Sequence, residues 1–222
     1  MHRLFLHSSS PVLLLLAKEF VSEYRNRYAC SVILAFSVIT VTSISISLAN
    51  SALSEETESV LLWIIIFFSA MAGLGRVYST EKDNNTLSTL RIYCCPQAIV
   101  FSKIVFNTVL LLGIACLTVL LFAAFFTLRV KDWVLFTVTI WLGVSGMAVV
   151  STLMASLAAE ARGTHALFTV INFPLLMPLL LTVTDLTTRS LQGVPADFDQ
   201  VCLLIGFDLM IAAVTILVVE WL

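Results

Sequence analysis

IVFNTVLLLGIACLTVLLFAAFFTL, residues 104–128, is an unbroken run of apolar and small residues without a charged side chain. A helix needs roughly 20 mostly apolar residues to cross the hydrocarbon core of a bilayer, and this run is long enough. In lipid each segment must satisfy its own backbone amides, so the run is predicted to be a helix. A later run is interrupted only by Asp208, and four more are uncharged throughout: Tyr28–Ser54, Ser59–Gly75, Trp133–Ala159 and Gly163–Thr184.

The composition agrees with a membrane protein, because 59% of the residues are hydrophobic and 12% are charged. Soluble domains carry about 25% charged residues. We therefore predict an all-α polytopic membrane protein with about six transmembrane helices and a single transmembrane domain over residues 1–222. The polar connections are too short for a soluble catalytic domain, and there is no P-loop pattern for ATP hydrolysis. The expected spans are 29–50, 59–78, 104–127, 133–158, 164–184 and 201–220.

The basic residues predict the orientation of the chain, because Lys and Arg concentrate on the cytoplasmic side of membrane proteins. With six spans and both termini in the cytoplasm, nine basic residues lie inside and three outside. The external three are Arg129, Lys131 and Arg189. The internal nine are Arg3, Lys18, Arg25, Arg27, Arg76, Lys82, Arg91, Lys103 and Arg162.

Charged and apolar residues alternate at helical spacing just before the first expected span. Phe20 and Tyr24 share one face of such a helix. The pattern predicts an amphipathic helix lying in the membrane interface, although a basic flank that fixes topology would leave the same pattern. The charged members of this interfacial helix are Lys18, Glu19, Glu23 and Arg25.

The connection between the second and third expected spans, residues 76–103, is the most informative polar segment. Leu87 and Leu90 could line one side of a short cytoplasmic helix, which Pro96 would end. Such a helix suits docking of a soluble partner, while an ordinary solvated connection remains an equal alternative. The residues expected to form this coupling segment are Glu81, Thr86, Leu87, Leu90 and Pro96.

Three residues inside expected spans are candidates for function. Asp208 is an ionisable group at membrane depth, for which a functional and a purely structural role are both open. Pro174 and Pro178 each free a backbone carbonyl and are expected to bend the fifth span. The segment 185–200 is expected to be an external loop or a partly re-entrant piece.

Several of these segments together resemble the haem exporter protein B (CcmB) family, within the type-2 ABC transporter membrane subunits. Lys18-Glu19-Phe20-x-x-Glu23-x-Arg25 is similar to the family's K-[DE]-L-x-x-E-x-R stretch. Glu81 to Pro96 resembles E-x-x-x-G-T-L-E-x-L…P, with departures at Asn85 and Ser88. Further similarities lie at Trp63, Arg76, Lys103, Leu142-Gly143-x-x-Gly146, Thr152-Leu153, Ala155 and Phe173-Pro174-Leu175-x-x-Pro178-Leu179.

The resemblance implies a permease subunit that is not itself an enzyme. It implies a cytoplasmic ABC ATPase partner contacting Glu81–Leu90, other cytochrome c maturation membrane proteins, and a multi-subunit complex in membrane lipid, without nucleic acid. The family's activity is haem export or release of a haem-loaded chaperone. The expected location is a bacterial cell inner membrane, since no arginine-rich or serine-rich leader is present.

The residues leave other functions open. A type-2 ABC permease for another hydrophobic or lipid-linked substrate would share the coupling segment, and a subunit that only scaffolds its partners is a further possibility. An intramembrane enzyme would need paired acids or metal ligands within the spans, whereas Asp208 stands alone there. Haem is expected as a handled ligand rather than a bound cofactor. The Cys95-Pro96 pair resembles regulatory haem motifs, but that proline has a plain role at a helix boundary.

Overall fold

The computed structural model describes residues 11–26, 28–47, 53–74, 95–126, 128–160 and 165–221. Within these ranges, the side chains of residues 11, 25–26, 28–30, 72–74, 96, 158–160, 165–171 and 219–221 are left out of the description. The described residues form seven α-helices and no strand. They are α1 (Pro11–Asn26), α2 (Tyr28–Ser47), α3 (Glu55–Leu74), α6 (Pro96–Phe125), α7 (Trp133–Glu160), α8 (His165–Gln192) and α9 (Phe198–Trp221).

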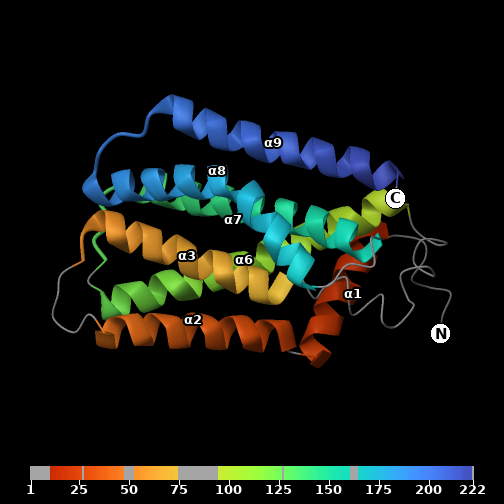
Figure 1. The fold of residues 1–222 in the computed structure, drawn as a ribbon, viewed down its shortest axis with the longest axis horizontal. Helices are drawn as coiled ribbons and strands as arrows, with labels where there is room; N and C mark the ends of the chain where they lie inside the picture. The colour runs from red at the N-terminus through yellow and green to blue at the C-terminus, as the bar shows by residue number, and fades with distance from the viewer. Residues whose placement is uncertain are drawn as a thin grey trace.

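Six of these helices run lengthwise beside one another, and α1 crosses the bundle at one end (Figure 1). We call this the α1 end; the C-terminal end of α9 also lies there. The opposite end, which we call the loop end, carries residues 53–54, 128–132 and 193–197. α7 contacts α3, α6, α8 and α9 and is more deeply buried than the other two long apolar helices, α6 and α9, so we call it the central helix.

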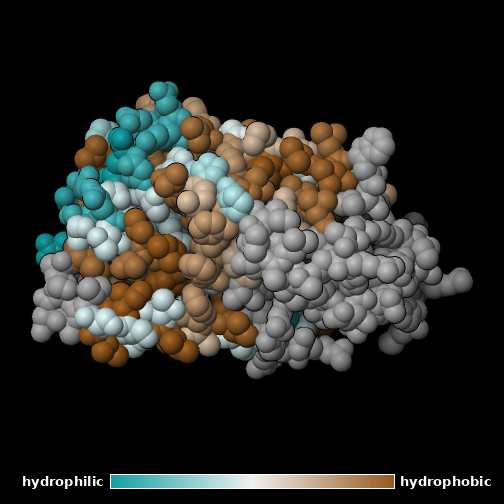
Figure 2. All heavy atoms as spheres, in the orientation of Figure 1, coloured by the Kyte–Doolittle hydropathy of each residue, from teal (hydrophilic) through white to brown (hydrophobic). Residues whose placement is uncertain are grey.

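Three of the described helices are long and apolar enough to cross a bilayer on their own: Gln97–Phe125, Trp133–Leu157 and Phe198–Val218. Ser31–Ser47 is a shorter apolar helix. On the face shown in Figure 2, hydrophilic side chains gather at the loop end and hydrophobic ones cover the middle of the bundle. The structure is therefore that of a helical membrane protein, with lipid as the natural solvent of its exposed apolar side chains.

α6 and α8 extend furthest past the ends of the spans expected from the sequence. α6 begins at Pro96, eight residues before the expected span, while the short helix that this proline was expected to end lies outside the described residues. A proline is accommodated at the start of α6 because the first helical position needs no amide hydrogen bond. α8 continues to Gln192, so the first half of segment 185–200 is helix rather than an external loop or a re-entrant piece. Gly193, with φ of 72°, ends α8 in a left-handed conformation.

α8 also changes direction along its length, and the bend lies in the cyan part of the helix in Figure 1. Pro174 and Pro178 lie inside this helix, as expected for a span bent by proline. Both proline side chains are exposed on the outside of the bundle.

The core of the bundle is built where Trp63 of α3 lies against the bare backbone of α7. Trp63 is fully buried, and its Nε1 donates a hydrogen bond of 2.8 Å to Oγ1 of Thr187 in α8. A Cβ on Gly143 would overlap the indole ring and would lie 2.9 Å from Cγ1 of Val183. α3, α7 and α8 thus meet here, and the indole ring of Trp63 fills the space that a side chain at residue 143 would occupy.

We expect Gly143→Ala to destabilise the folded protein by about 1–3 kcal/mol, because the added methyl group overpacks this contact. The measurement is thermal unfolding of the purified protein in detergent. Gly113→Ala on α6 is the matched control, since a Cβ there meets no atom within 4 Å. Equal melting temperatures for the two variants would contradict the packing described here.

Candidate functional site

The most unusual contact in the molecule is a buried ion pair between α1 and α6. Nζ of Lys103 lies 3.1 Å from Oε1 of Glu19, 84 residues earlier in the chain. Lys103 is 0% exposed and Glu19 is 7% exposed. Nζ of Lys18 lies 3.5 Å from the same carboxylate oxygen, on the more exposed side. A lysine is almost never fully buried unless it is paired, and here the partner comes from a different helix.

The pair forms because one face of α1 is turned toward α6. Leu15 and Glu19 are four residues apart, lie on the same face of α1, and are both buried. Next to them, the rings of Phe20 and Phe106 meet edge to face at 5.1 Å between centroids. Apolar and charged contacts therefore both hold α1 against the first turns of α6.

The residues expected to form the interfacial helix are helical, as α1, but the charged residues described there do not share one exposed side. Glu19 lies inside the protein, whereas Glu23 is half-buried. The exposed large side chains of α1 are apolar: Leu13, Leu14, Phe20, Val21 and Tyr24. This arrangement suits a helix at the edge of a bilayer, with its apolar residues outward. The side chain of Arg25 is outside the described residues.

The predicted coupling segment lies almost entirely outside the described residues, which hold none of Glu81, Thr86, Leu87 and Leu90. Pro96 is placed as the first residue of α6, after Cys95 in an extended conformation with ψ of 138°. The carbonyl of Cys95 accepts hydrogen bonds from the amides of Ala98 and Ile99 at 3.0 and 3.3 Å. The chain therefore enters a well-formed helix about two turns before Lys103.

Asp208 of α9 lies against the central helix α7. Its Oδ2 accepts a hydrogen bond of 3.0 Å from Oγ of Ser145. A Cβ on Gly146 would overlap Oδ1 of Asp208 and Cδ1 of Leu179. The carboxyl group is thus held in a notch that exists because residue 146 has no side chain. The contact satisfies Oδ2 of the carboxylate, whereas Oδ1 is buried without a hydrogen-bond partner among the described residues.

Other polar side chains lie buried between the helices. Nδ2 of Asn107 in α6 donates to Oγ1 of Thr152 in α7 at 2.8 Å, and the hydroxyls of Ser37 and Ser69 join α2 to α3 at 2.9 Å. Some buried polar atoms have no protein hydrogen-bond partner, among them both side-chain atoms of Asn172, two residues before Pro174. The polar groups of the described bundle are therefore satisfied in part only.

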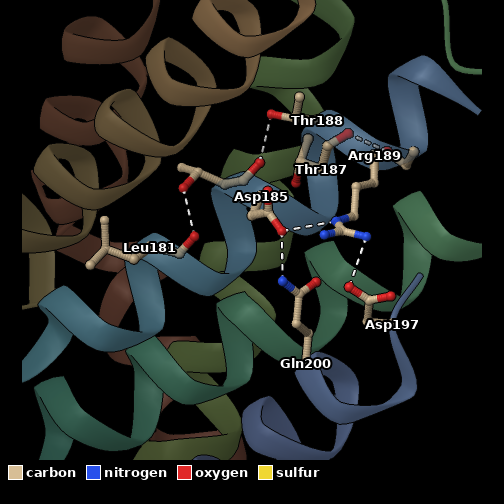
Figure 3. Close-up of polar contacts among 9 residues, drawn as sticks. Leu181, Asp185, Thr187, Thr188, Arg189, Asp197 and Gln200 are labelled. Carbon is tan, nitrogen blue, oxygen red and sulfur yellow. Dashed lines mark hydrogen bonds and ion pairs between the residues drawn. The ribbon is translucent and has the colours of Figure 1, made fainter. Parts of the chain in front are cut away.

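At the loop end, α8 is tied to the start of α9 by a charged network (Figure 3). Nε and Nη1 of Arg189 each lie 2.9 Å from a carboxylate oxygen, of Asp185 and Asp197 respectively. Nε2 of Gln200 donates to Asp185 at 2.7 Å. The hydrogen bond to Asp185 is the largest cause of the raised pKa of Arg189. This network neutralises one of the three basic residues expected outside the membrane, and the sequence did not reveal it.

No set of three His, Cys, Asp or Glu side chains is placed to hold a metal ion in the part of the chain that the structure describes. The thiols of Cys95, Cys116 and Cys202 are free and exposed. Ionic and hydrogen-bonded links between helices, rather than a reactive centre, are the chemistry that these residues provide.

Comparison with protein families gives one finding: residues 11–220 match the family described as CcmB protein. No curated protein matches the chain. The matched range contains Glu19, Lys103, Gly146 and Asp208, as well as the coupling segment that the structure leaves undescribed.

Lys103→Met should cost at most about 3–5 kcal/mol of stability, because it removes the buried partner of the Glu19 carboxylate and leaves the more exposed Lys18 as the nearby charge. Glu19→Gln together with Lys103→Met should recover most of this loss, since neither variant side chain then needs a counter-charge. The free energy of unfolding in detergent measures both. If the double variant is as unstable as Lys103→Met, the loss of stability does not come from the Glu19 carboxylate that Lys103 no longer neutralises.

Gly146→Ala should destabilise the bundle by about 1–3 kcal/mol through overlap with Asp208 and Leu179. In an Asp208→Ala background the same change should cost less, because one of the two overlaps is gone. A double-mutant cycle on melting temperatures in detergent measures the coupling. Gly206→Ala is the control on α9, where a Cβ meets nothing within 4 Å. If the losses of stability from Gly146→Ala and Asp208→Ala are strictly additive, Asp208 does not occupy the space beside Gly146.

Proposed function

The chain belongs to the CcmB family, whose members are membrane components of the haem export system for cytochrome c maturation; from this membership we propose a mechanical role. The chain would be the permease subunit that couples ATP hydrolysis in a separate partner to haem export or to release of a haem-loaded chaperone. It would not be an enzyme itself. The observation that carries this proposal is the extent of the family match, which covers all seven described helices.

The partner ATPase is proposed to contact the chain between Glu81 and Leu90, on the cytoplasmic side. This segment joins α3 to α6 along the chain. Two features support the assignment: the segment carries the family pattern, and α6 starts directly after it at Pro96. A rigid helix that begins beside a docking segment can pass a movement of the docked partner into the membrane.

We further propose six membrane spans, α2, α3, α6, α7, α8 and α9, in a bacterial inner membrane with both termini in the cytoplasm. The loop end would then be external and the α1 end cytoplasmic. The nine-to-three distribution of basic residues supports this orientation. The common position of α1 and of the C-terminal end of α9 supports an even number of spans.

Haem is proposed as the cargo of the complex, or as the ligand of the chaperone that the complex releases. His2 and His7 precede α1, and His165 opens α8. In the proposed topology these histidines lie on the cytoplasmic side, away from the external acceptor. An alternative is a type-2 ABC permease for another hydrophobic or lipid-linked substrate, which would use the same coupling segment.

The test is haem staining of c-type cytochromes in a strain that lacks this gene and carries a restored copy. Deletion should abolish staining, and the wild-type copy should restore it. A copy with Glu81→Lys and Leu87→Asp should fail to restore it, because it reverses a charge and places a carboxylate in the proposed docking segment.

Glu56→Lys is the control for the charge change, since Glu56 is exposed at the loop end, which the proposed topology places on the other side of the membrane from the docking segment. It should restore staining, and both variants should reach wild-type levels in the membrane fraction. Normal staining after deletion would refute the role in cytochrome maturation and favour the permease for another substrate.

A further inference from the structure

We propose that the Glu19–Lys103 pair joins α1 and the first turns of α6 into one rigid unit that moves as a whole during the transport cycle. On this view α1 is a lever that passes a movement of α6 to α2. The inference rests on the proposed function for the source of that movement. The joining of the two helices rests on their contacts alone.

The two helices are joined by contacts that resist sliding and separation. Separating them would take the Glu19 carboxylate away from the fully buried Lys103, which is unfavourable for an ammonium group. Phe20, next to Glu19, and Phe106, three residues after Lys103, add an edge-to-face contact at 5.1 Å between ring centroids. The ion pair and the ring contact lie on neighbouring residues of α1 and about one turn apart on α6, so together they fix the orientation of α1 as well as its position.

The place of the pair in the chain makes this unit suited to transmission. Lys103 lies seven residues, or about two turns, after Pro96, where α6 begins, and thirteen residues along the chain from Leu90 at the end of the proposed docking segment. At its other end, α1 is separated from α2 by residue 27 alone. The axes of α1 and α2 differ strongly in direction, and α1 contacts α6 more extensively than it contacts α2 (Figure 1).

α1 is therefore expected to move with α6, although the chain connects it directly to α2. A tilt of α6 displaces α1 with it, and a connection of one residue passes the displacement to the start of α2. α2 in turn contacts α3, where Ser37 and Ser69 share a hydrogen bond. Through the ion pair, α2 and α3 both follow the movement of α6, the helix that comes after the docking segment in the chain.

The experiment uses the whole complex, with the five cysteines of this chain replaced by serine or alanine. Glu19→Gln with Lys103→Met removes the ion pair without leaving a buried charge. We expect c-type cytochrome staining to fall roughly tenfold while ATP hydrolysis by the purified complex stays near that of the wild type, a loss of coupling. Membrane levels of the chain must match the wild type.

Phe20→Cys with Phe106→Cys, bridged by a short bifunctional thiol reagent, then replaces the pair by a covalent link. Bridging should restore staining to within roughly twofold of the wild type in the variant without the ion pair, because the coupling is regained. In the chain that keeps the pair, bridging should leave staining unchanged. Mass spectrometry of the recovered chain gives the bridged fraction, and each cysteine alone with the reagent is the control.

If bridging blocks maturation in the chain that keeps the pair, α1 and α6 must separate during the cycle and the inference is wrong. The same conclusion follows if bridging fails to rescue the variant. A failure of the proposed function looks different, because deletion of the gene would then leave cytochrome staining intact before any variant is compared.

Discussion

At Gly143 and Gly146, the backbone of α7 lies bare against side chains from α3, α8 and α9. In lipid there is no hydrophobic effect to press apolar helices together, so close approach and interhelical hydrogen bonds must hold the bundle. Trp63 uses the first glycine and Asp208 the second. These contacts position α3, α8 and α9 against α7.

Hydrogen bonds between buried polar side chains also hold the helices together. The Trp63–Thr187, Asn107–Thr152 and Ser145–Asp208 bonds each join two helices through groups that would be costly to leave unpaired in lipid. Polar atoms without a protein partner remain in the described bundle, such as those of Asn172. Satisfied and unsatisfied polar groups therefore coexist between the described helices.

The helical class followed from the sequence because uncharged runs of bilayer length have no other stable conformation in lipid. Individual members of the important contacts, Glu19, Trp63, Lys103, Gly143 and Gly146, also stood out through the family resemblance. Their pairing did not. Glu19 and Lys103 are 84 residues apart, and Trp63 and Thr187 are 124 apart. Helices that are apolar on all sides carry no periodicity to show which face turns inward.

Lys103 shows most clearly what the sequence could not predict. It is a charged residue beside an apolar run, which is typical of a residue in contact with water, and it is one of the nine basic residues counted on the cytoplasmic side. Its burial depends on a carboxylate supplied by another helix, which no local pattern around residue 103 reveals. The same holds for Asp208, whose place against Ser145 and Gly146 is set by how α7 and α9 cross.

The ion pair also orders events while the chain is being made. Glu19 leaves the ribosome 84 residues ahead of Lys103, which at synthesis rates of roughly 5–20 residues per second is a delay of several seconds. Throughout that interval α2 and α3 can enter the bilayer before Lys103, the buried partner of the Glu19 carboxylate, has been made. α6 then brings most of the contacts that hold α1 to the bundle. The first helix to be synthesised is thus among the later ones to find its place.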